Sequence, residues 1–118
     1  MNRGEIIKIL EQSGAMKNGH FLLASGKHSE KYVQCAKLFE RPEYAEKLVA
    51  ELISELDTEQ IDTVAGPAVG AVIMAYEVAR QLGKRVIFTE RKTGVMSLRR
   101  GFEIVPGERI LVVEDVVT

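Results

Sequence analysis

The sequence predicts an α/β fold in which helices flank a mainly parallel sheet. Residues 110–113 form an apolar run without polar alternation, which is typical of a strand buried on both faces. Residues 63–66 form a second such strand. A turn of small residues joins it to a helix that is expected to begin near residues 68–70, to continue over 71–82 and to stop at Gly83. A third strand is expected over 85–89. Strands that alternate with helices in this way build parallel sheets through right-handed crossovers.

The remaining segments predict short elements around this core. Pro42 and Glu43 suit the first turn of a helix, and apolar residues at helical spacing follow them as far as Leu56. Ser25 and Gly26 indicate a turn between two short strands. The other elements expected are a helix over 5–10 that stops by Gly14, hairpin strands over 21–23 and 32–33, and a strand over 102–104 before a turn at Pro106 and Gly107.

Length and composition exclude several classes of protein. A chain of 118 residues holds one domain at most, and a formal net charge of −1 gives no support to binding of nucleic acid or an anionic membrane. Cys35 is the only cysteine, so an intrachain disulfide is excluded and a cytoplasmic location is expected. No apolar run approaches the roughly 20 residues of a membrane span. The start of the chain also lacks the pattern of a signal peptide.

Two segments carry candidate chemistry. Glu114 and Asp115 directly follow the predicted strand over 110–113, and ligands of parallel sheets bind beyond the carboxyl ends of strands. Acids at that place can hold ribose hydroxyls or a hydrated magnesium ion. The small residues from Gly66 to Gly70 let a ligand approach the backbone, and the helix start that follows can bind an anion. The turn is not a nucleotide P-loop, because Gly-Lys-Ser/Thr is absent.

The two histidines give a weaker signal. His20 and His28 are eight residues apart, which is not the spacing of two metal ligands on one helix. We therefore expect both side chains to be solvated.

Two patterns together resemble a known family. Residues 112–118, Val-Val-Glu-Asp-Val-Val-Thr, resemble the first part of the signature of type I phosphoribosyltransferases, which bind 5-phosphoribosyl 1-diphosphate (PRPP). A second pattern resembles the N-terminal hood of the orotate branch of this family, and its members are Phe21, Leu23, Ser25, Gly26, Ser29 and Tyr32. The resemblance runs from about Gly19 to Thr118 and covers only the first part of such an enzyme.

The resemblance implies a phosphoribosyltransferase-like, Rossmann-related fold and a glycosyltransferase activity of the pentosyltransferase class. Phosphoribose would pass from PRPP to orotate and give orotidine 5′-phosphate and diphosphate, a step of pyrimidine (UMP) biosynthesis. Mg²⁺ is the implied cofactor, and a homodimer with shared active sites is the implied assembly. The implied organisation is one incomplete domain, with a helix and hood in residues 1–40 and the first part of the core sheet in residues 41–118.

The resemblance also implies roles for single residues. Glu114 and Asp115 would hold ribose hydroxyls or magnesium through water, and Arg91 and Lys92 would stand at the base of a mobile catalytic loop. The PRPP and diphosphate contacts would be Gly66, Pro67, Ala68, Val69, Gly70, Arg99, Arg100, Val116 and Val117, with a non-proline cis peptide in the turn over 66–70. The orotate contacts would be Ser25, Gly26, Tyr32, Val33 and Thr118.

This chain departs from the family pattern at three positions. Ala24 stands where many relatives have a lysine, and Val95 and Ser97 stand where better-known members have lysine and histidine. Three alternatives stay open: a purine phosphoribosyltransferase, a PRPP-sensing regulator, and a non-catalytic fragment that acts as an association surface. We expect the strand over 110–113 to lie beside the strand over 63–66 as a sheet edge, two further strands to follow in a complete enzyme, and these 118 residues alone to lack activity.

Overall fold

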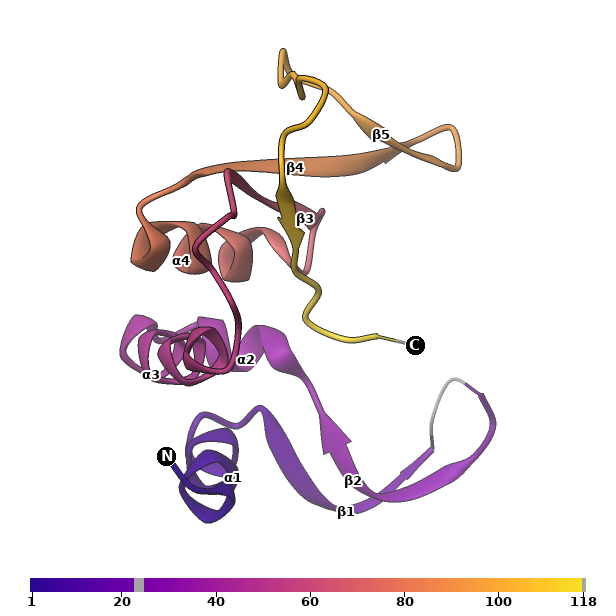
Figure 1. Cartoon of the computed structure of the whole chain (residues 1–118). Helices are drawn as coiled ribbons and strands as arrows, with labels where there is room; N and C mark the ends of the chain where they lie inside the picture. Colours follow the sequence, from indigo (N-terminus) through magenta and orange to yellow (C-terminus); the bar gives the residue numbers. More distant parts are fainter. Residues whose placement is uncertain (23–24, 118) are drawn as a thin grey trace. The chain divides into compact units, whose positions relative to one another are not determined.

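The computed structural model describes residues 1–22 and 25–117, without the side chain of Phe21 (Figure 1). The chain divides into two compact units, Met1–Leu48 and Val49–Thr118. The division falls inside helix α3 (Pro42–Ser54), eight residues after the boundary that the sequence suggested. Among the described residues, no helix has both the length and the apolar character that crossing a membrane requires.

The N-terminal unit contains a helix and an antiparallel hairpin. Helix α1 (Arg3–Gln12) starts at Asn2, whose side-chain oxygen accepts a hydrogen bond from the Glu5 N–H at 2.9 Å. Strands β1 (Met16–Leu22) and β2 (His28–Val33) pair antiparallel, with Met16 opposite Val33 and Leu22 opposite His28. This confirms the predicted hairpin, although the part of its first strand at Leu23 lies outside the described residues.

Two further helices follow the hairpin. Helix α2 (Cys35–Phe39) has five residues, no side-chain cap and no predicted counterpart in the sequence pattern. Helix α3 begins at Pro42, as predicted, and ends at Ser54 rather than at Leu56. The predicted apolar face of α3 is confirmed at Ala45 and Val49, which are both buried.

The C-terminal unit contains a four-stranded sheet in the order β5-β4-β3-β6 (Figure 1). Strand β3 (Thr63–Pro67) pairs parallel with β4 (Arg85–Lys92) on one side and with β6 (Ile110–Val112) on the other. Helix α4 (Val72–Leu82) connects β3 to β4 and packs on both strands. The sheet is therefore mainly parallel, and β6 lies beside β3 at its edge in the described part of the chain, as predicted.

Close packing of β3 against α4 depends on a glycine. A Cβ atom at Gly66 would lie 2.8 Å from the Ala71 carbonyl oxygen and 2.9 Å from the Ala75 Cβ. Only a residue without a side chain fits there, because ordinary contact begins at 3.4 Å. The helix starts a little later than the sequence suggested, at Val72, and ends at Gly83 with φ +70° as expected.

The segment after β4 corrects one prediction. The expected strand over 102–104 is wrong: β5 (Val95–Leu98) is the strand that returns, and it pairs antiparallel with the end of β4. Thr93 and Gly94 form the turn between them, with φ of 51° and 81°. A two-residue turn in which both φ angles are positive matches the right-handed twist of the two strands it connects. We call residues 89–100 the basic hairpin. Phe102 instead packs edge-on against Phe88, with ring centroids 5.2 Å apart.

A polar cluster lies at the start of β3, at the opposite end of the strand from Gly66. Glu108 accepts hydrogen bonds from the hydroxyl of Thr63, from Arg85 Nη2 at 2.9 Å and from the Val105 N–H at 3.2 Å. The Thr63 hydroxyl, the Arg85 guanidinium and the Val105 N–H together lower the pKa of Glu108 to about 2. The cluster ties the connection before β6 to the starts of β3 and β4.

Candidate functional site

The turn after β3 and the acids after β6 meet at the same edge of the sheet. A Cβ atom at Gly70 would lie 2.8 Å from Oδ2 and 3.0 Å from Oδ1 of Asp115. The Val113 N–H still donates to the Ala65 carbonyl at 2.9 Å, so the two strands run together until the acids begin. The structure therefore brings together two segments that lie 45 residues apart in the sequence, as predicted.

The turn itself exposes backbone. The Ala68–Val69 peptide is cis, as the resemblance implied. The Ala68 N–H donates to the Thr89 carbonyl at 2.6 Å, which anchors the start of the turn, and the Val69 side chain is 86% exposed. Within the described part of the chain, the N–H groups of Val69 and Gly70 have no hydrogen-bond partner. Adjacent free N–H groups at an exposed turn are suited to bind phosphate oxygens.

The acids form a like-charged pair. Glu114 is exposed and Asp115 is half-buried, and the Asp115 N–H donates to Glu114 Oε1 at 3.0 Å. The neighbouring Asp115 carboxyl raises the pKa of Glu114. Two carboxylates held this close favour a cation, and their hard oxygen atoms fit Mg²⁺. Among the described residues, no three or more His, Cys, Asp or Glu side chains gather to hold a metal, so such an ion would keep several water ligands.

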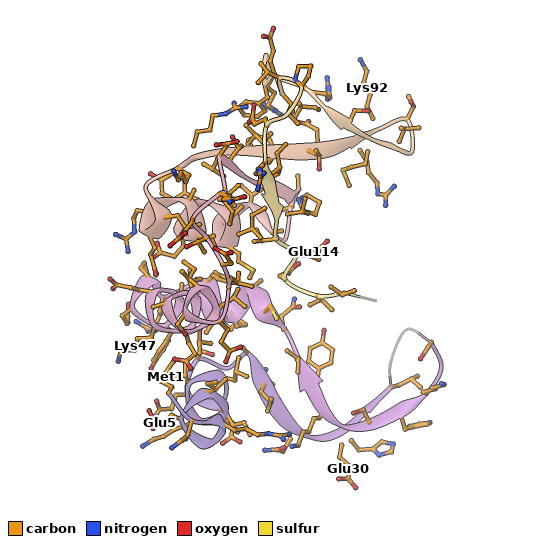
Figure 2. All side chains as sticks on the ribbon, viewed as in Figure 1. Met1, Glu5, Glu30, Lys47, Lys92 and Glu114 are labelled. Atoms are coloured by element: carbon orange, nitrogen blue, oxygen red, sulfur yellow. The ribbon has the colours of Figure 1, made fainter. Side chains whose placement is uncertain are left out.

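The predicted cations lie on the basic hairpin. Arg91 donates to the Gly94 carbonyl at 3.2 Å across the turn, and Lys92 is exposed. Figure 2 shows Lys92 on the hairpin and Glu114 on the segment after β6, at clearly separate places in this unit. The structure thus does not bring Lys92 and Glu114 together.

The sequence did not single out Glu90. Its carboxylate accepts from Arg100 Nε at 2.6 Å and from Arg99 Nη1 at 3.1 Å. The Arg100 guanidinium, which also lies 5.7 Å from the centre of the Phe88 ring, lowers the pKa of Glu90. Both arginines that were predicted to bind diphosphate are therefore paired with a carboxylate. Sequence spacing does not predict these ion pairs, because Arg99 and Arg100 are nine and ten residues from Glu90. The register of the hairpin brings them together.

A hollow of about 590 Å³ joins the turn to the basic hairpin. Its walls hold side chains from the turn, from the start of α4, from β4 and from the end of the basic hairpin: Ala68, Val69, Val72, Ile73, Phe88, Glu90, Arg91 and Arg100. Glu114, Asp115 and Lys92 are not among them. Predicted diphosphate contacts from two segments therefore share one open depression.

The other predicted contacts divide between the two units. In the N-terminal unit, Ser25 and Gly26 lie in the exposed turn after β1, and Tyr32 and Val33 end β2 with about 40% of their surfaces exposed. In the C-terminal unit, Val116 and Val117 follow the acids and are exposed. Thr118 lies outside the described residues, as does Ala24.

Comparison with known proteins identifies relatives along the whole chain. A family model described as the phosphoribosyl transferase domain matches residues 36–118. The orotate phosphoribosyltransferase of Desulforamulus reducens is 54% identical over 118 residues, all of this chain and 62% of that protein. That of Thermotoga maritima is 57% identical over 113 residues, 96% of this chain and 60% of that protein. The chain thus spans about three fifths of the length of these curated relatives.

Solved structures share the fold at lower identity. A crystal structure of orotate phosphoribosyltransferase from Aeropyrum pernix has a TM-score of 0.71 at 24% identity, covering 91% of this chain and 62% of that one. An adenine phosphoribosyltransferase from Saccharomyces cerevisiae has a TM-score of 0.63 at 13% identity, covering 94% and 70%. Identities this low support the architecture and leave the base that is bound undecided.

Proposed function

Because the chain belongs to the phosphoribosyl transferase domain family, we propose that this protein transfers phosphoribose from PRPP to orotate. The observation that carries the proposal is the contact between Gly70 and the Asp115 carboxylate, which joins a turn of free N–H groups to a pair of acids. The choice of orotate is supported by relatives of that name that are 52–57% identical to this chain. It is supported as well by the hood pattern from Phe21 to Tyr32.

In the proposed reaction, the bond between ribose C1 and diphosphate breaks and a bond from C1 to a pyrimidine nitrogen forms. Positive charge builds on the ribose ring while negative charge builds on the leaving diphosphate. Catalysis then requires donors and cations that are already aimed at the diphosphate, and a site that excludes water so that PRPP is not hydrolysed.

The diphosphate would be held by the turn and by the basic hairpin. The free N–H groups of Val69 and Gly70 provide donors that need no rearrangement. Arg91 lines the same hollow as the turn and adds a fixed positive charge. Arg100 lines it too, but its guanidinium must exchange the Glu90 carboxylate for a phosphate oxygen.

The ribose would be held by Asp115 and Glu114, as acceptors for its hydroxyl groups or through water on a magnesium ion. Mg²⁺, when bound, supplies charge neutralisation for the departing diphosphate. The raised pKa of Glu114 supports this assignment, because a nearby cation would relieve the repulsion from Asp115.

The orotate would be bound by residues of the hood and by Thr118. Ser25, Gly26, Tyr32 and Val33 are proposed from the hood pattern, and all four residues are exposed.

A homodimer is proposed as well. Apolar side chains gather on the exposed side of α4, where Ile73 is 59% and Tyr76 is 63% exposed, three positions apart and next to the exposed Val69. Apolar surface of this kind is typical of an association site.

The experiment that tests the proposal is a segment exchange. These 118 residues replace the matched segment of the Desulforamulus reducens protein, and orotate absorbance is followed with PRPP and Mg²⁺. We expect turnover with orotate and none with adenine or hypoxanthine. Use of adenine in place of orotate would refute the assigned substrate. The 118 residues alone are expected to show at most a trace of orotate turnover. Turnover by them at the rate of the chimera would refute the expectation that this segment alone lacks activity.

The acids provide the first variants of the chimera. Asp115→Asn and Glu114→Gln keep the shape of each side chain and remove its charge. Each is expected to lower kcat/KM at least ~100-fold, as loss of one transition-state contact does. Lys84→Ala, an exposed change beyond the far end of α4, is the control. Near-normal kcat/KM in both acid variants would show that the site is assigned wrongly.

A further inference from the structure

The hairpin of the N-terminal unit brings both histidines of the chain together. His20 Nε2 and His28 Nδ1 are 2.8 Å apart, and the ring centroids are separated by 4.7 Å at a tilt of 33°. His28 opens β2, while His20 lies in β1 where the strand register shifts between Asn18 and Phe21. An irregularity of this kind re-aims a side chain. The two histidines meet across paired strands, so the spacing of metal ligands on a helix does not apply to them.

The separation of the two nitrogen atoms suits a shared metal ion. Metal–imidazole bonds of 2.0–2.1 Å place two nitrogens about 2.9 Å apart at a right angle, and about 3.3 Å apart at a tetrahedral angle. The observed 2.8 Å is close to the first value. Right-angled nitrogen ligands are typical of tetragonal Cu²⁺ and Ni²⁺, whereas Zn²⁺ prefers the tetrahedral arrangement.

The chemistry of the pair also differs from that of the acids. Neutral imidazoles favour late transition metals, whereas the carboxylates of Glu114 and Asp115 favour Mg²⁺. Both histidines are exposed, so an ion can reach them with most of its water shell intact. One ring now donates its N–H to the other, and on binding that proton would move to the outer nitrogen of the same ring through water. No proton is lost overall.

We propose that His20 and His28 form a cross-strand chelate for a tetragonal divalent transition metal, Cu²⁺ or Ni²⁺. Two protein ligands fill adjacent positions, and water fills the others. Among the described residues no third His, Cys, Asp or Glu completes a larger group. The site is therefore an exchangeable one, and it lies on the same hairpin as the proposed orotate contacts Ser25, Gly26, Tyr32 and Val33.

The test uses the tag-free 118-residue chain with NiCl₂ in isothermal titration calorimetry. We expect one Ni²⁺ per chain, and MgCl₂ should give no heat. Loss of an outer-shell partner alone weakens metal sites 10–100-fold, so His20→Ala and His28→Ala should each weaken binding at least ~10-fold. The control is Lys31→Ala, three positions along β2 from His28, where side chains point to the other face. Circular dichroism checks that each variant is folded.

A spectroscopic readout separates a chelate from binding to one ring. Electron paramagnetic resonance of the Cu²⁺ complex should show coupling to two nitrogen nuclei, and to one or none in either alanine variant. The proposal is overturned by a wild-type chain that does not bind Ni²⁺ below millimolar concentration. It is equally overturned if only one of the two alanine variants loses binding, since a single imidazole would then suffice.

Discussion

Gly70→Ala tests whether the contact between the turn and the acids matters for catalysis. The added Cβ would lie 2.8 Å from Oδ2, 3.0 Å from Oδ1 and 3.2 Å from Cγ of Asp115. The shortest of these falls roughly 0.6 Å short of the 3.4 Å at which ordinary contact begins, so the carboxylate has to move by about that amount. Gly70 has no positive φ, so the backbone itself tolerates alanine.

A displacement of this size is large for a carboxylate with the proposed catalytic role. A misplacement of about 1 Å can cost 10²-fold in rate, so we expect kcat/KM of the chimera to fall about 10- to 100-fold. The unfolding free energy should change by less than about 1 kcal/mol, because a half-buried carboxylate at the edge of the sheet gives way rather than the core. The orotate assay measures the first quantity, and urea unfolding followed by circular dichroism measures the second.

A double variant isolates the cause. If Gly70→Ala acts through Asp115, then adding it to Asp115→Asn should produce little further loss, because the two changes disturb one contact. Full additivity of the two losses would show that the turn acts independently of the acid. Unchanged kcat/KM in a folded Gly70→Ala chimera would refute the reasoning about the contact itself.

Two predictions concern stability. Glu108 has a folded-state pKa of about 2, below its ordinary value of 4.5, so its stabilising contribution is complete above pH 4.5 and is lost as the pH falls toward 2. Urea unfolding at pH 6 and pH 3 should show a smaller loss of stability in Glu108→Gln than in the parent, and equal losses would contradict the assignment. Gly66→Ala forces a Cβ to 2.8 Å from the Ala71 carbonyl and should cost about 1–3 kcal/mol of unfolding free energy. A urea midpoint equal to that of the parent chain would show that α4 shifts without cost.

Local patterns predicted most of the sheet and the centre of the site. The apolar run that became β6, the small residues after β3 and the αL cap at Gly83 are all visible within a few neighbouring residues. Burial on both faces removes polar alternation, and a left-handed helix end selects glycine. Because the carboxyl ends of parallel strands share one edge, the meeting of Gly70 and Asp115 followed from those assignments.

Pairing across a hairpin could not be predicted in the same way. Val95 to Leu98 has an ordinary strand composition, and the turn at Thr93 and Gly94 decides that it returns along β4. The prediction of a strand over 102–104 was wrong, because Phe102 packs its ring against that of Phe88 and its backbone does not pair with a strand. The Glu90 ion pairs and the contact of His20 with His28 depend on the same cross-strand register. Helix α2, with five residues and no cap, is too short for a periodic signal.

Strand β4 pairs parallel with β3 and antiparallel with β5, and Thr89 takes part in both pairings. This residue faces Pro67 in the parallel ladder and Leu98 in the antiparallel one. The basic hairpin is thus a continuous extension of the sheet, and a movement of its cations relative to the sheet would bend β4 near Thr89. Fixing the backbone of a free residue costs about 1–2 kcal/mol. In the proposed reaction, the paired backbone of β4 would have met that cost before PRPP binds, which would leave more of the binding free energy for the transition state.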